Sequence, residues 1–178
     1  LNEWKEGKVQ FLVKINPAYL SQNPSAHINA MIQDLGVPEE PSVMITVQDM
    51  NSSEMASMYS KADVFINTTR AEGFGLTGLE ARACGLSTIQ SCYGGQTDYM
   101  ETDTDTMIEE GVMEDITFDV TYEGVKWFTP SILAIRKAMR WAYEHQEDIK
   151  KAGERASASC IKWTWRCTAE KASKLLKE

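Results

Sequence analysis

Short apolar runs alternate with helical patterns along the first half of this chain. The runs are rich in branched and aromatic residues and predict β-strands over 9–15, 42–47, 62–67 and 87–91. Between them, apolar residues at helical spacing predict helices over 25–35, 53–61 and 77–84, the second capped by Ser52 or Ser53. Strands and helices that alternate in this way form βαβ units. The pattern therefore predicts an α/β fold, a doubly wound parallel sheet of the Rossmann-like kind with helices on both faces.

The last third of the chain predicts a helical tail. Thr129 as N-cap and Pro130 as first helical residue predict the start of a long helix, and a final helix is expected to begin near Thr164. Both should bury an apolar face, made of Ile132, Ile135, Met139 and Ala142 in the first helix and of Trp165, Ala169, Ala172 and Leu176 in the second. We expect a Rossmann-like domain over 1–128 and helices over 129–178 that pack on the same domain.

Acidic side chains are concentrated in one segment. Residues 99–123 contain nine Asp and Glu and no Lys or Arg, so they account for the net charge of −8 of the whole chain. We expect an irregular, solvated surface insertion here, with a short strand over 116–120. Because no basic cluster balances this charge, the sequence argues against nucleic acid as a partner.

The composition is that of a soluble globular protein, with 178 residues of which 43% are hydrophobic and 25% charged. No apolar run reaches the roughly 20 residues of a membrane span, so we expect no span. The chain begins at Leu1 without a signal-peptide pattern, and we interpret it as a piece of a longer protein.

Its four cysteines form no CxxC pair, and Cys84 and Cys92 lie among apolar residues. We interpret the cysteines as reduced thiols, which predicts a cytoplasmic location. With only two histidines, a zinc site is not expected.

A glycine-rich loop separates the predicted strand 62–67 from the helix 77–84. It contains Gly73 and Gly75, and Gly78 follows inside the helix. A loop of this kind directs backbone N–H groups and the positive end of a helix at an anion, usually phosphate. Glu72 and Glu80 flank it, and because carboxylates repel phosphate they need another task, such as binding hydroxyl groups. A nucleotide sugar offers both a diphosphate and hydroxyls.

Other interpretations of this loop stay open. The three glycines match the G-x-G-x-x-G fingerprint of a dinucleotide-dependent oxidoreductase, and Asp98 lies 20 residues after the last of them. In that fold, however, the first glycine follows the strand almost at once and the acidic residue ends the next strand. Thr77 and Glu80 also fit a capping box, which would explain Glu80 with no ligand. A noncatalytic nucleotide- or sugar-binding module is a further alternative.

Several motifs together resemble a known family. They are the run 62–67, the loop 72–76, the helix residues 79–85, the run 93–99, and a tail that contains Trp127, Pro130, 139–141, 153–156 and 163–165. They resemble the C-terminal, donor-binding domain of retaining glycosyltransferases of the GT-B fold, in the large family that includes sucrose synthase and many mannosyl- and glucosyltransferases. Its hallmark is two glutamates with seven residues between them, as Glu72 and Glu80 have here.

The resemblance implies roles for individual residues. Glu72 would be catalytic, contacting the donor sugar and stabilising positive charge at its anomeric carbon, and Glu80 would accept hydrogen bonds from the nucleotide ribose. The glycine loop would hold the diphosphate, through Gly73 and through the N–H groups of Phe74, Gly75, Leu76 and Thr77. The base would lie near Val47 and Gln48. The resemblance implies no metal and no cofactor beyond the substrate, a GDP- or UDP-linked sugar.

The chain also departs from the family pattern. Members carry an Arg and a Lys that bind the diphosphate after the first strand of this domain, and that pair would precede Leu1. Lys14 could substitute in part for this Arg and Lys, with a solvated lysine as the alternative.

The N-terminal, acceptor-binding domain of the same protein is missing, so this segment alone is expected to be inactive. In the complete protein the acceptor would be a glycan or another hydroxyl compound. Residues 96–98 either contact the donor or form a plain turn.

Overall fold

The computed structural model describes residues 8–16, 26, 30, 33–34, 43–117 and 120–176. It divides into two compact units, Leu1–Glu54 and Met55–Glu178, each of which is described by itself. Both units contain parallel strands, and the chain alternates strands with helices, which is the α/β class expected from the sequence.

The first unit contains two parallel strands. β1 (Phe11–Ile15) pairs with β2 (Val43–Val47) in a register that sets Lys14 beside Thr46 and Ile15 beside Val47. The helix predicted over 25–35 lies outside the described residues, apart from a few single positions. α3 (Ser52–Tyr59) follows β2. Its cap is Asn51 rather than the predicted Ser52 or Ser53, because the Asn51 side chain accepts from the N–H of Glu54 and the Glu54 carboxylate accepts in return from the Asn51 N–H.

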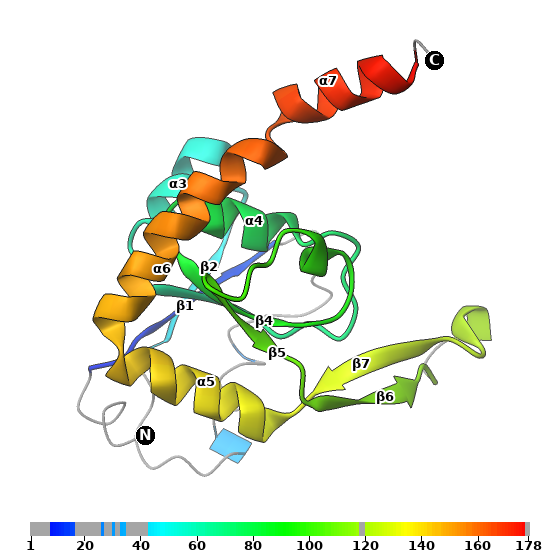
Figure 1. The fold of residues 1–178 in the computed structure, drawn as a ribbon. Helices are drawn as coiled ribbons and strands as arrows, with labels where there is room; N and C mark the ends of the chain where they lie inside the picture. The colour runs from blue at the N-terminus through cyan, green and yellow to red at the C-terminus, as the bar shows by residue number, and fades with distance from the viewer. Residues whose placement is uncertain are drawn as a thin grey trace. The chain divides into compact units, whose positions relative to one another are not determined.

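The second unit is built on a parallel sheet of β3 (Val64–Asn67), β4 (Ser87–Ser91) and β5 (Asp105–Ile108), with β4 in the centre. Successive side chains of each strand point to opposite faces of the sheet. On one face, Ile89 and Ile108 pack against the small residues of α5 (Ile132–Glu144). On the other face lie α3 and α4 (Leu76–Ala83), covering Phe65 and Met107 (Figure 1). Helices therefore cover both faces, as predicted.

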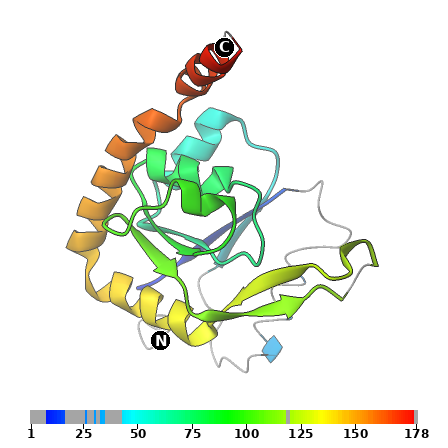
Figure 2. The same cartoon turned by 45° about the vertical axis from the view of Figure 1, so that its right-hand side comes forward.

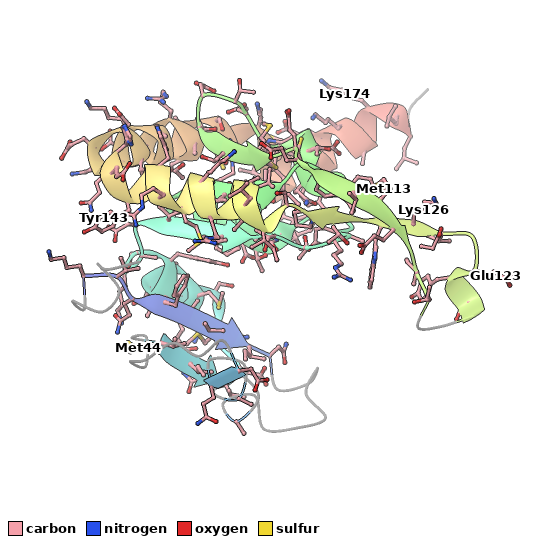
Figure 3. The ribbon with its side chains drawn as sticks, turned by 90° about the horizontal axis from the view of Figure 1, so that it is seen from below. Met44, Met113, Glu123, Lys126, Tyr143 and Lys174 are labelled. Atoms are coloured by element: carbon pink, nitrogen blue, oxygen red, sulfur yellow. The ribbon has the colours of Figure 1, made fainter. Side chains whose placement is uncertain are left out.

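The acidic segment is partly ordered into strands, which corrects the expectation of an irregular insertion. β5 lies within it and pairs with the buried β4. β6 (Gly111–Asp115) then forms an antiparallel hairpin with β7 (Lys126–Pro130), and η3 (Val120–Tyr122) precedes the return strand. The hairpin extends away from the sheet, with Met113 and Lys126 along it and Glu123 near its tip (Figure 3). The strand predicted over 116–120 is wrong: residues 116 and 117 carry none, and 118–119 are outside the described residues.

The helical tail begins later than predicted. Ser131, not Thr129, is the N-cap of α5, and its side chain accepts from the N–H of Ala134 at 3.3 Å. Thr129 and Pro130 belong to β7, where Pro130 closes the strand. The inner face of α5 is made of Ala134, Ala138 and Ala142, with Ile135 and Met139 partly buried, while Ile132 is 75% exposed.

Two further helices complete the second unit. α6 (Gln146–Ser159) packs at the amino end of β4 and leads through η4 (Cys160–Trp163) to α7 (Trp165–Leu175), which is capped by Thr164 as expected (Figure 2). The prediction that α7 buries its apolar residues is wrong, because no residue of α7 is buried and Trp165 is 82% exposed.

All four cysteines are free, as expected, although Cys84 is exposed rather than surrounded by apolar side chains. In the part of the chain that the structure describes, no helix is both long and apolar enough to cross a membrane.

Candidate functional site

The glycine-rich loop connects the carboxyl end of β3 to α4. Gly75 is the N-cap of α4 and adopts the left-handed conformation, with φ 80°. The first two helical N–H groups, on Leu76 and Thr77, and those of Phe74 and Gly75 before them, have no hydrogen-bond partner among the described residues. Four successive N–H groups at the positive end of a helix form a concentrated donor site for an anion.

A second glycine loop packs directly against the first. It follows β4, and the N–H of Gly95 donates to the Glu72 carbonyl at 3.0 Å. A Cβ on Gly94 would meet the Glu72 backbone at 2.7 Å, and one on Gly95 would collide with the carbonyl of Gly73. Only glycines allow this backbone contact. Both loops lie at the carboxyl ends of adjacent parallel strands, the edge where ligands bind in open α/β sheets.

The glycines of the first loop serve different purposes. A Cβ on Gly75 would lie 2.8 Å from the Tyr99 hydroxyl, and one on Gly78 would collide with the Tyr99 and Gln90 side chains. These two glycines are explained by internal packing. Gly73 has no positive φ and nothing within 4 Å of its Cβ position. The space beside Gly73 is therefore open to the approach of another molecule.

The two glycines give opposite expectations for alanine. We expect Gly75→Ala to destabilise the complete protein by about 1–3 kcal/mol, because its φ and its neighbours both disfavour a side chain. Gly73→Ala is expected to leave stability within about 0.5 kcal/mol and to weaken nucleotide binding. Urea unfolding and calorimetry with UDP, GDP and ADP measure the two effects. Equal destabilisation by both variants would contradict this assignment.

The two glutamates have different environments. Glu72 is half-buried, and its Oε1 accepts from the N–H of Gly73 at 3.1 Å, so that amide is occupied. Glu80 is exposed in the second turn of α4, where its Oε2 accepts from the Tyr59 hydroxyl at 3.3 Å. The capping-box alternative is wrong, since Gly75 is the N-cap and Thr77 lies inside the helix without a cap hydrogen bond.

The dinucleotide alternative is not supported by the placement of Asp98. That residue lies in the single-turn helix η2 (Gly95–Asp98) and is exposed, whereas the dinucleotide fold needs an acidic residue at the end of a strand. Thr97 in the same turn bonds to the Gly94 carbonyl at 2.8 Å, and Gln96 is fully buried. Residues 96–98 thus form a turn that supports the Gly94–Gly95 contact.

The predicted site residues of the first unit are described by themselves. Lys14 is the fourth residue of β1 and is half-buried. Val47 ends β2 with 38% exposure, and Gln48 follows it in an exposed position. The structure does not relate these residues to the glycine loop, so their contact with a donor stays a prediction.

Sequence reasoning missed the polar layer beneath α4. Arg82, fully buried, pairs with Asp105 of β5, and its other donors reach Thr104 at 2.9 Å and Ser159 at 2.8 Å. The second Asp105 oxygen accepts from the Thr88 hydroxyl at 2.6 Å. Hydrogen bonds thus connect the last turn of α4 to the sheet and to α6.

The same layer continues to the first turn of α4. Gln90 Nε2 donates to the Thr88 hydroxyl at 2.8 Å. The Tyr99 hydroxyl lies 3.1 Å from Gln90 Oε1 and 2.8 Å from the carbonyl of Gly75, the N-cap. Burial raises the pKa of Tyr99 to about 12, so the hydroxyl keeps its proton as a donor. The helix is therefore hydrogen-bonded at both ends to the side chains below it.

The hairpin lies against the edge of the site. The Phe128 N–H donates to the Arg70 carbonyl at 3.0 Å, and the Phe128 ring stacks on Tyr93, with 5.7 Å between centroids. The Arg70 guanidinium lies 4.6 Å from the centroid of the Trp127 ring. Strand β7 therefore contacts the segments that lead into both glycine loops, and Arg70 adds a positive charge beside them.

A metal site is not found among the residues that the structure describes: no three His, Cys, Asp or Glu side chains are grouped to hold an ion.

Comparisons with solved structures show the fold. Sucrose-phosphate synthase from Thermosynechococcus elongatus matches with a TM-score of 0.71 and 19% identity, covering 97% of this chain and 39% of that one. Anabaena HepE, solved in complex with UDP-glucose, matches with a TM-score of 0.71 and 15% identity over 95% and 41% of the two chains. This chain thus spans about two fifths of the length of either protein.

A third structure is a separate C-terminal domain. The C-terminal domain of the group 1 glycosyltransferase LpcC from Francisella tularensis matches over 90% of both chains, with a TM-score of 0.59 and 13% identity. The fold is that of the C-terminal Rossmann-like domain of GT-B glycosyltransferases. No curated protein sequence matches the chain.

The family follows from a sequence model. Residues 25–119, more than half of the chain, match the model described as glycosyl transferases group 1, and they include both glutamates and both glycine loops. This chain belongs to the group 1 glycosyltransferase family.

Proposed function

We propose that this chain is the donor-binding part of a retaining glycosyltransferase, which transfers a sugar from a nucleotide diphosphate to an acceptor hydroxyl in the complete protein. One observation carries the proposal: four successive N–H groups at the start of α4, with no protein partner in the described part of the chain, lie between Glu72 and Glu80. Two proteins with a similar fold add support, since HepE was solved with UDP-glucose and a starch synthase from Arabidopsis thaliana with ADP and acarbose.

The loop would act on the leaving group. A departing nucleoside diphosphate gains negative charge in the transition state, and the N–H groups of Phe74, Gly75, Leu76 and Thr77 have no hydrogen-bond partner among the described residues. Donors that are fixed before the reaction lower its barrier, and losing one such donor typically costs about 3 kcal/mol. We propose that the helix end performs this task without a metal and without another cofactor.

Glu72 would act on the sugar. Its carboxylate is fixed by the Gly73 N–H, which leaves Oε2 to accept from sugar hydroxyls and to stabilise positive charge at the anomeric carbon. In a retaining reaction the acceptor hydroxyl attacks from the face on which the diphosphate leaves, and the departing oxygen takes its proton. The acceptor would be a glycan or another hydroxyl compound, bound with help from an N-terminal domain of the same protein.

Other parts of the proposal concern the donor's identity and surroundings. We propose a GDP- or UDP-linked sugar, with the base near Val47 and Gln48 and with Lys14 as a partial substitute for the family's Arg and Lys. Four free cysteines support a reducing, cytoplasmic location.

The nucleotide-binding role of Glu80 has a direct test. In the complete protein, Glu80→Ala is expected to weaken nucleoside diphosphate binding roughly 10-fold to 100-fold, because two hydrogen bonds to a charged acceptor are lost. Calorimetry with UDP, GDP and ADP measures this effect and identifies the base. Glu154→Ala, at an exposed position of α6, is the control and should bind normally.

Two outcomes would contradict the proposal. Unchanged affinity in Glu80→Ala would remove the ribose role. Nucleotide binding by the complete protein with no transfer to any acceptor and no hydrolysis of any donor would favour a noncatalytic binding module.

A further inference from the structure

We propose that Tyr59 is a positioning residue, which holds the Glu80 carboxylate in the orientation that accepts the two ribose hydroxyls of the nucleotide. The inference rests on the proposed function and adds a residue that neither the glycine motif nor the glutamate spacing includes. The hydrogen bond between the Tyr59 hydroxyl and Glu80 Oε2, at 3.3 Å, is the observation from which it starts.

The Tyr59 ring is held firmly by its surroundings. Tyr59 is the last residue of α3, is 5% exposed, and belongs to a core cluster with Ala81 and Leu86. The Phe65 ring meets it edge-on, with 6.1 Å between centroids and 73° between ring planes. Because the ring is packed on several sides, the hydroxyl occupies one place in the structure.

The hydroxyl at that place is a donor. Burial, and next the negative charge of Glu80, raise the pKa of Tyr59 above its usual value, so the phenol stays neutral and keeps its proton. A carboxylate can only accept, so the direction of this hydrogen bond is fixed. The bond therefore ties one Glu80 oxygen to a rigid point of the core.

The remaining acceptor sites of Glu80 suit a vicinal diol. Among the described residues, the Tyr59 hydroxyl is the only hydrogen-bond partner of this exposed carboxylate. One proton occupies one of about four lone-pair positions, so both oxygens can still accept from a ligand. An untethered glutamate on a helix surface would sample several rotamers and lose that freedom on binding. Tethering Oε2 in advance reduces this cost.

A purely structural role for Tyr59 makes a different prediction. If the hydrogen bond to Glu80 only satisfied the buried Tyr59 hydroxyl, Tyr59→Phe would change stability and would alter the affinity for every nucleotide by the same factor. A positioning role acts through Glu80, so the effect must depend on the ligand hydroxyls that Glu80 binds.

A cycle that combines a protein change with a ligand change separates the two roles. The complete protein and its Tyr59→Phe variant are titrated by calorimetry with the nucleoside diphosphate that binds best among UDP, GDP and ADP, and with its 2′-deoxy counterpart. We expect Tyr59→Phe to weaken ribonucleotide binding roughly threefold to tenfold. The affinity lost on removing the 2′-hydroxyl should shrink in the variant by a similar factor. Thermal unfolding first establishes that the variant is folded.

Tyr143→Phe is the matched control, because Tyr143 lies on α5, on the other face of the sheet (Figure 3). It should reproduce the wild-type affinities for both nucleotides. An identical 2′-deoxy penalty in the wild type and in Tyr59→Phe would overturn the positioning role. Glu80→Ala distinguishes a failure of the proposed function from a failure of the present inference. If Glu80→Ala binds nucleotide normally, the ribose role of Glu80 is wrong. If it binds weakly while Tyr59→Phe binds as the wild type does, only the positioning role of Tyr59 is wrong.

Discussion

Glu72→Gln is expected to reduce glycosyl transfer by the complete protein roughly 100-fold or more, while nucleotide affinity stays within about twofold of the wild type. Glutamine has the shape of glutamate, and its amide oxygen can still accept from the Gly73 N–H, so the loop keeps its conformation. In the proposed mechanism, the substitution removes the negative charge that stabilises the anomeric carbon. That charge matters only when positive charge develops there, in the transition state.

Transfer assays and calorimetry on the same preparation separate the two effects. Glu109→Gln, at an exposed position after β5, is the control and should be fully active. Full activity in Glu72→Gln would show that the carboxylate charge has no catalytic role. A large loss of nucleotide affinity would instead place Glu72 at the nucleotide.

Arg82→Met is expected to lower the free energy of unfolding by about 3–5 kcal/mol, the largest stability effect that we predict. The substitution removes the guanidinium but leaves Asp105 buried, with one carboxylate oxygen still aimed at the missing partner. The hydrogen bonds to Thr104 and Ser159 are lost as well, which removes the Arg82 links from α4 to the start of β5 and to the end of α6.

Urea unfolding of the complete protein measures this effect, and two variants make it specific. Arg155→Met breaks an exposed pair with Asp103, 3.6 Å apart, and should cost less than about 1 kcal/mol. Arg82→Met combined with Asp105→Leu removes both buried charges and should recover part of the loss. If Arg82→Met cost no more than Arg155→Met, the buried pair would not be a main support of the fold.

Local patterns predicted the parts of the fold that depend on near neighbours. The strands ending at Asn67 and Ser91 and the helix after Gly75 follow from apolar runs and glycine placement within a few residues. β5 was missed because its first residue is acidic, and the buried aspartate is neutralised by Arg82, 23 positions earlier, and accepts a hydrogen bond from Thr88, 17 positions earlier. A pairing over that separation has no signature in a local window.

The exposed face of α7 was missed for a related reason. Apolar spacing predicts which side of a helix is apolar, but it does not show whether another element covers that side. Trp165 and Leu176 follow the helical spacing and yet are 82% and 87% exposed.

The candidate site divides in the same way. The glycine spacing and the two flanking glutamates predicted where the N–H groups of the loop would gather. The reasons for Gly75 and Gly78 could not be predicted, since Tyr99 and Gln90 come from later segments. Tyr59 precedes Glu80 by 21 positions and was assigned only to the inner face of its helix.

The layer beneath α4 has a mechanical consequence. Apolar contacts between a helix and a sheet tolerate small translations and rotations of the helix, because such contacts have no preferred direction. The bonds from Tyr99 to Gly75 and from Arg82 to Asp105 are directional, and they anchor opposite ends of the same short helix. These bonds fix the position of α4 along its axis and its rotation about that axis. The orientation of the N–H groups at the start of α4 is thus set by contacts within the protein, so that under the proposed function no affinity is spent on reorienting them.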